Sequence, residues 1–199
     1  MVAKRQKDET EIACQQILSQ DSSVYSIQWL VIPAPHAAGV TAAFLLDRYL
    51  SHVRKYTHSI IRPETSAGGI EFRLCRSAAS VLSFAPPEFS ATAGSTAVHL
   101  CIAGGMLVQA DECDRGKLSL LAEGIAGGTR ITIQLSDYCP LLLGSQKPSR
   151  LRKLFYRLTQ AYIHKVVTIK FLARLYRELA GEKICVRVKK VTVHEGEEI

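Results

Sequence analysis

Apolar and polar positions change their period several times along the chain, and each change predicts a new element of secondary structure. Residues 5–20 are mostly polar and predict a short helix, which the run Asp21-Ser22-Ser23 ends. The apolar stretch 27–32 predicts a buried strand that stops at Pro33. After Gly39, apolar residues recur every three or four positions and predict a helix: Val40, Ala43, Phe44, Leu46, Leu50 and Val53.

Strands and helices are predicted to alternate through the middle of the chain. Strands are expected at 57–62, 70–75, 97–103 and 130–135. A short helix with a surface loop is expected at 77–95, and a further helix at about 114–123. This alternation is typical of an α/β fold with a mostly parallel sheet and helices on both faces, so the pattern predicts that fold class.

The C-terminal part of the chain has a different pattern. After a breaker at 144–148, apolar residues repeat at helical spacing from Leu151 to Leu179, and Gly181 is a good helix stop. The pattern predicts one long amphipathic helix, or two, followed by an alternating strand at 184–193 and an acidic tail. We therefore expect an α/β domain over 1–145 and a basic helical extension over 146–199.

Positive charge is concentrated in this extension. The chain has a formal net charge of +7, and the segment 147–190 contains 13 Lys and Arg residues against Glu178 and Glu182 alone. The candidate nucleic-acid contacts are Arg150, Lys153, Arg157 and Lys165, with Tyr156 and Tyr162 nearby to stack on bases. Two alternatives remain: the charges solvate one face of an amphipathic helix, or they bind an acidic protein.

Cysteine and hydropathy patterns exclude several classes of protein. The six cysteines include no Cys-x-x-Cys pair, so we expect buried free thiols, with disulfides as the alternative, and neither a zinc site nor any other metal or cofactor. No apolar run approaches the ~20 residues of a membrane helix, and the first residues do not resemble a signal peptide. A soluble intracellular protein without a membrane partner is the expectation.

Three segments resemble the motifs of RecJ-type phosphoesterases of the DHH superfamily. The segment 29–50 matches the strand, glycine turn and Val-Thr-Ala helix start of the first motif, with His36 and Ala38 at the positions of two metal-binding aspartates. The segment 97–105 resembles the second motif, with Ala103 at the aspartate position. The segment 131–140 resembles the third motif, in which Asp137 matches the aspartate and Tyr138-Cys139 replace two histidines.

These departures from the family pattern determine the function that the resemblance implies. One aspartate and one histidine are too few ligands for the metal that activates the attacking water, so we expect no catalysis. If the resemblance holds, His36, Ala38, Ala103 and Asp137 converge at the carboxyl edge of a parallel sheet. An active phosphoesterase with an unusual metal site at His36 and Asp137 is a minor alternative.

Inactivated RecJ-like proteins serve as structural subunits of replicative helicases. The resemblance therefore implies a scaffold that binds GINS and MCM helicase proteins, with single-stranded DNA as a further partner. Such a protein would be cytoplasmic and nucleoid-associated in an archaeon, and nuclear in a eukaryote. The alternative is a stand-alone nucleic-acid-binding protein associated with RNA or the ribosome. Among the remaining histidines, His52 and His58 are expected at the surface, and His99 as a buried histidine with a partner.

Overall fold

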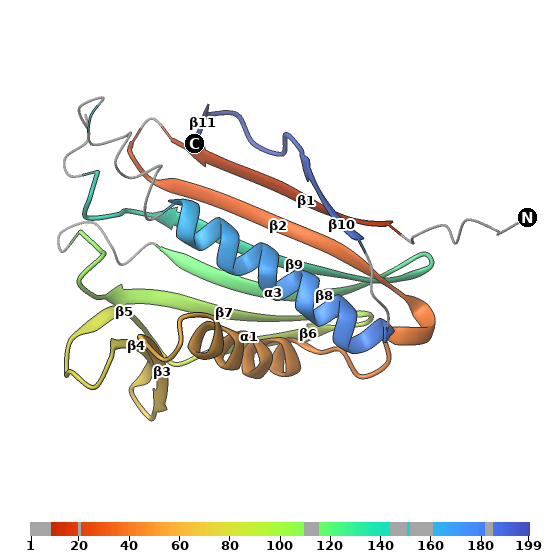
Figure 1. Cartoon of the computed structure of the whole chain (residues 1–199), viewed down its shortest axis with the longest axis horizontal. Coiled ribbons are helices and arrows are strands. Elements are labelled where there is room, and N and C mark those ends of the chain that lie inside the picture. The colour runs from red at the N-terminus through yellow and green to blue at the C-terminus, as the bar shows by residue number, and fades with distance from the viewer. Residues whose placement is uncertain (1–8, 20, 110–115, 144–150, 152–160, 182–184) are drawn as a thin grey trace, which may run out of the picture.

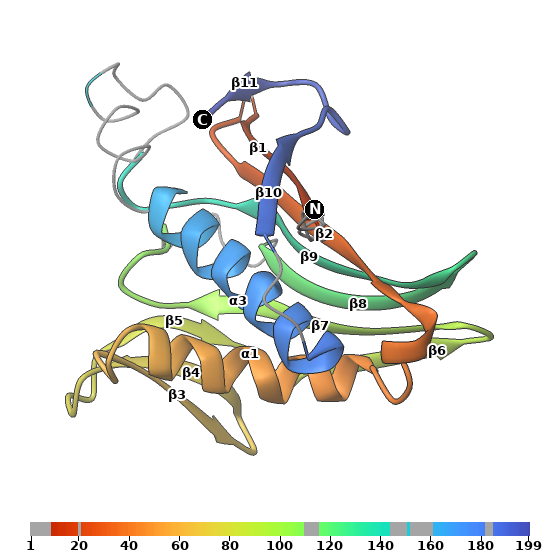
Figure 2. The ribbon, with the colours of Figure 1, turned by 45° about the vertical axis from the view of Figure 1, so that its right-hand side comes forward.

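One large β-sheet with two helices on the same face makes up the described part of the chain (Figure 1). The computed structural model describes residues 9–19, 21–109, 116–143, 151, 161–181 and 185–199. The helices are α1 (Ala42–Tyr56) and α3 (Tyr162–Ala180), and the short 3-10 helix η1 (Ala34–His36) precedes α1. A second view shows both helices in one layer in front of the sheet (Figure 2).

Within the described residues the sheet contains eleven strands. Nine of them follow the order β10-β1-β2-β9-β8-β7-β5-β4-β3, while β11 pairs with β1 and β6 pairs with β7. The strands from the first half of the chain are β1 (Glu9–Leu18), β2 (Val24–Pro33), β3 (Ile61–Ser66), β4 (Gly69–Leu74), β5 (Ser80–Phe84) and β6 (Glu88–Thr92). The later strands are β7 (Ser95–Gly104), β8 (Lys117–Ile125), β9 (Gly128–Tyr138), β10 (Cys185–Lys190) and β11 (Glu197–Glu198).

The predicted fold class, a mostly parallel sheet with helices on both faces, is wrong. Only β1 and β10 run parallel; the other strand pairs in the described residues are antiparallel. Short connections explain the difference, because two-residue turns can join only antiparallel strands. Between β8 and β9 such a turn is formed by Ala126 and Gly127, and Gly127 has a φ of 90°.

Three predicted helices are strands instead. The segment 5–20 contains β1, the segment 77–95 contains β5 and β6, and most of the segment 114–123 lies in β8. A short apolar run fits either a helix or a buried strand, and tertiary packing decides between them. In β8 the run Leu118-Ser119-Leu120 is buried throughout, which a strand in the middle of a sheet can achieve.

Other predicted elements are confirmed. The stretch 27–32 lies within β2, the helix after Gly39 is α1, and the stretch 130–135 lies within β9. Thr41 caps α1 by accepting a hydrogen bond from the Phe44 N–H at 3.3 Å. Gly181 ends α3 in a left-handed conformation, and its N–H donates to the Arg177 carbonyl at 3.0 Å.

The core lies between the sheet and the helices. In β2 every second residue is buried: Val24, Ser26, Gln28, Leu30 and Ile32. These residues share the helix-covered face, because Gln16, which pairs with Ser26, donates to the Ala161 carbonyl next to α3 at 3.3 Å. The opposite face of the sheet, named here the open face, carries alternate residues such as Trp29 and Thr132, which are half-buried.

Elements of the predicted C-terminal extension belong to the same sheet and core. Strand β10 pairs with β1, and α3 packs Phe171 and Leu172 into the core. Residues after β10 cover one corner of the open face, where the Gln15 side chain donates to the His194 carbonyl at 2.6 Å and accepts from its N–H at 3.0 Å. Strand β1 therefore contacts β10 at one edge and the residues after β10 on the open face.

Replacing one helix-facing residue should destabilise the fold far more than replacing its outward-facing neighbour. Leu30 is 1% exposed and Val31 is 37% exposed. Leu30→Ala should lower the free energy of unfolding by about 2–5 kcal/mol because it leaves a cavity. Val31→Ala should cost less than about 1 kcal/mol. Urea denaturation of both variants measures this, and equal losses would contradict the assigned faces.

Candidate functional site: a cationic cleft between the two helices

A shallow cleft runs between α1 and α3, which lie side by side and in opposite directions (Figure 2). Each helix lines it with residues spaced i, i+3, i+4 and i+7, which places their side chains on one helix face. The lining residues are Arg48, Ser51, His52 and Lys55 from α1, and Phe171, Arg174, Leu175 and Glu178 from α3. The cleft therefore collects three cations and one carboxylate.

Glu178 holds two of these cations in place. Its Oε1 lies 2.9 Å from Nε of Arg174, one helical turn earlier on the same helix, and its Oε2 lies 3.7 Å from a terminal nitrogen of Arg48. Lys55 forms no ion pair with any described residue. One carboxylate against three cations leaves an excess of positive charge, so the cleft is suited to an anion.

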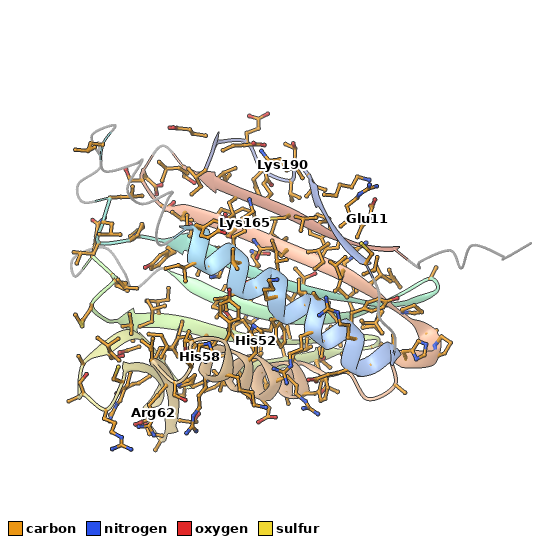
Figure 3. All side chains as sticks on the ribbon, viewed as in Figure 1. Glu11, His52, His58, Arg62, Lys165 and Lys190 are labelled. Carbon is orange, nitrogen blue, oxygen red and sulfur yellow. The ribbon has the colours of Figure 1, made fainter. Side chains whose placement is uncertain are left out.

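His52 lies at the two helices (Figure 3) and is one of the residues that line this cleft. It is 5% exposed, packs at 5.6 Å from the Phe171 ring, and has no well-formed hydrogen bond at either ring nitrogen within the described residues. Burial lowers the pKa of His52, the Arg174 charge acts in the same direction, and the Val167 carbonyl opposes them. Burial therefore favours the neutral ring, and the expected surface position of His52 is wrong.

The cleft is part of a wider cationic surface on the helices. Helices α1 and α3 carry six exposed Lys and Arg residues but only two exposed carboxylates, Asp47 and Glu178. The six are Arg48, Arg54, Lys55, Lys170, Arg174 and Arg177. We call this surface the cationic helix layer. Because both helices lie on one face of the sheet, these charges are presented on one side of the molecule (Figure 1).

Polar side chains lie beneath the first half of α3. The Gln28 amide nitrogen donates to the Ser26 hydroxyl at 2.7 Å, and its amide oxygen has no partner among the described residues. Burial lowers the pKa of His164 to about 4, and its Nε2 is buried without a described partner. Burial also raises the pKa of Cys14, and the positive charge of Lys165 acts in the opposite direction by lowering it. This half of α3 covers a polar part of the sheet.

The basic segment 147–190 includes the α3 cations of this layer, but none of the four residues nominated from the sequence belongs to it. Lys165 lies half-buried near the start of α3 (Figure 3), whereas Arg150, Lys153 and Arg157 lie outside the described residues. The cations of α1 were missed, although the amphipathic spacing of that helix was recognised. Its polar face, with Arg48 and Lys55 seven residues apart, was the signal that could have found them.

The four positions drawn from the DHH motifs do not converge. His36 follows β2 directly, and the end of β2 pairs with the start of β9 at Gly128. Asp137 is near the other end of β9, an 11-residue strand whose ends lie on the order of 30 Å apart. Ala38 lies two residues after His36, whereas Ala103 is near the end of β7 that lies towards Asp137, because Cys101 pairs with Lys117 and Lys117 with Ser136. The expected common edge is therefore absent.

Other expectations about single side chains have mixed outcomes. His99 has a partner as expected, with its Nδ1 2.8 Å from the Ser119 hydroxyl, but it is half-buried on the open face. His58 is exposed as expected. Of the five described cysteines, all have free thiols, and only Cys14 and Cys139 are buried.

The described residues contain neither a group of metal ligands nor a helix that could span a membrane. No three His, Cys, Asp or Glu side chains of this part of the chain gather closely enough to hold a metal ion. Neither described helix combines the length and apolar character needed to cross a membrane.

Comparisons with known proteins give little beyond a weak similarity of shape. No family model matches the chain, and no curated protein matches it. A solution structure of CalU16 from Micromonospora echinospora aligns over 92% of this chain and 79% of its own, with 11% identity and a TM-score of 0.37. A crystal structure of the same protein aligns over 86% and 96%, with 10% identity and a TM-score of 0.34. Similarity this weak carries no functional argument.

His164, near the start of α3, should make the fold sensitive to acid. His164 has a pKa of about 4 in the folded protein and near 6.5 when unfolded, so the unfolded state binds more protons between these values. Stability should therefore fall as the pH is lowered from 6.5 towards 4. Urea denaturation between pH 7 and pH 5 should show a smaller loss in His164→Gln than in the wild type. Parallel curves for the two proteins would contradict the assignment.

Proposed function

We propose that this protein is a non-catalytic nucleic-acid-binding module, in which the cationic helix layer contacts the phosphate backbone. The observation that carries the proposal is the gathering of six exposed cations against two carboxylates on two adjacent helices. Three of these cations, Arg48, Lys55 and Arg174, border one cleft, where a phosphate group can contact side chains from both helices.

The number of cations matters more than any single one. One exposed ion pair contributes little, because water and salt screen it. Several phosphate contacts made together release several condensed counterions, and this release supplies most of the free energy of sequence-independent binding. Lys55 and Lys170 are good candidates for such contacts, because neither forms an ion pair with a described residue, and the same holds for Arg54 and Arg177.

Two expectations from the sequence have no support in the fold. The role beside GINS and MCM followed from the DHH resemblance, and the parallel sheet that this resemblance implied is absent. That role and the absence of catalysis stay predictions. Recovery of GINS or MCM proteins with the tagged chain would favour the helicase role over independent nucleic-acid binding.

Removing Lys55 and Lys170 together should weaken binding in a salt-dependent way. For a labelled single-stranded oligonucleotide, log K should fall linearly with log salt concentration. If both lysines contact phosphates, Lys55→Gln with Lys170→Gln should reduce the steepness of this line by about 1.4, because each contact on a single strand contributes about 0.7. Fluorescence anisotropy across a salt series, with RNA, single-stranded DNA and duplex DNA, provides the measurement.

A matched variant controls for net charge. Arg76→Gln with Lys117→Gln also removes two charges, but Arg76 lies in the turn between β4 and β5 and Lys117 lies on the open face. This control should keep the wild-type slope. An equal decrease of the salt slope in both double variants would show that only the net charge matters. Absence of binding to all three nucleic acids at low salt would refute the proposal.

A further inference from the structure

The free edges of the sheet differ in how well they are protected against pairing with another strand. Natural edge strands carry lysine, proline or other charged residues that prevent such pairing. Edge strand β3 contains Arg62, Pro63 and Glu64, and edge strand β10 contains Arg187, Lys189 and Lys190. Strand β6, with the sequence Glu88-Phe-Ser-Ala-Thr92, has one carboxylate and no basic residue, and prolines occur only directly before it, at Pro86 and Pro87.

Strand β6 is also the most exposed of these edges. It pairs with β7 alone, from Glu88 opposite His99 to Thr92 opposite Ser95, without an irregularity in register. All five of its residues are exposed, and the Phe89 side chain is 58% exposed. An unbroken strand with a free edge and an exposed aromatic side chain is a template for one more antiparallel strand.

We propose that β6 pairs in the antiparallel direction with β6 of a second copy of this chain. A two-fold axis at Ser90 relates the two copies. Among antiparallel registers, only the one centred on Ser90 pairs all five residues. It places Glu88 opposite Thr92 of the second copy, and Phe89 opposite Ala91 of the second copy. The single charge is thereby kept away from its own symmetry mate, and each phenylalanine faces a small residue that leaves room for the ring.

Self-complementarity is the reason to choose a second copy over an unrelated strand. The same five residues satisfy both sides of the pairing, as an isologous interface requires. The two sheets would join into one, with the helices of both copies on the same side. A five-residue strand forms a small interface, so the dimer should be weak and dependent on concentration. The inference does not depend on nucleic-acid binding.

Opposite charges at position 92 test both the dimer and its register. In the proposed register, Thr92→Lys faces Glu88 of the second copy and should tighten the dimer, while Thr92→Glu faces the same carboxylate and should weaken it. Each change occurs twice per dimer, so we expect shifts in Kd of about twofold to thirtyfold in opposite directions. Sedimentation equilibrium over a concentration series measures Kd, with reductant present because Cys75 and Cys185 are exposed.

A charge swap completes the test. Glu88→Lys with Thr92→Glu places opposite charges across the pair again, so it should tighten the dimer relative to the wild type in the same direction as Thr92→Lys. Position 92 is exposed, so all variants should melt like the wild type by circular dichroism. A protein that stays monomeric at every concentration would overturn the proposal. A dimer whose Kd does not change with these substitutions would overturn it too. So would a Kd that changes in the same direction for lysine and for glutamate at position 92.

Discussion

Burial of one face of the sheet is the constraint on which the rest of the structure depends. Strands β2, β9, β8 and β7 place large apolar side chains on that face, and Leu30, Ile133, Leu120 and Leu100 are each at most 1% exposed. Such residues stabilise the fold only when a second layer covers them. Helices α1 and α3 provide this layer, and their packing fixes which helix faces point outwards.

The outward faces of the helices can then carry charge at little cost to stability. Arg48 and Arg174 stay solvated while Phe171, from the same cleft, packs against His52 and Tyr49 in the interior. On the open face of the sheet, charges pair with one another, as in Arg130 with Glu123 and Lys189 with Glu11, beside half-buried residues such as Trp29. The molecule therefore has two different sides, and the cationic helix layer is the side suited to a polyanion.

The sequence predicted local elements better than their arrangement. Helix α1 and the end of α3 were predictable because helical spacing and a C-terminal glycine are local signals. The sheet was not, since a run such as Leu118-Ser119-Leu120 is compatible with a helix, a parallel strand or an antiparallel strand. A motif resemblance then favoured the parallel arrangement. The cleft requires two helices about 120 residues apart in sequence to meet, which no local pattern reveals.

The cationic helix layer, and not the open face, is the surface that we propose binds nucleic acid. Nuclear magnetic resonance of the labelled full chain, titrated with a single-stranded oligonucleotide at low salt, tests this residue by residue. The account predicts that amide shifts change along α1 and α3, around Arg48, Lys55 and Lys170, while Trp29 and Thr132 on the open face stay unchanged. Changes confined to the open face would contradict it.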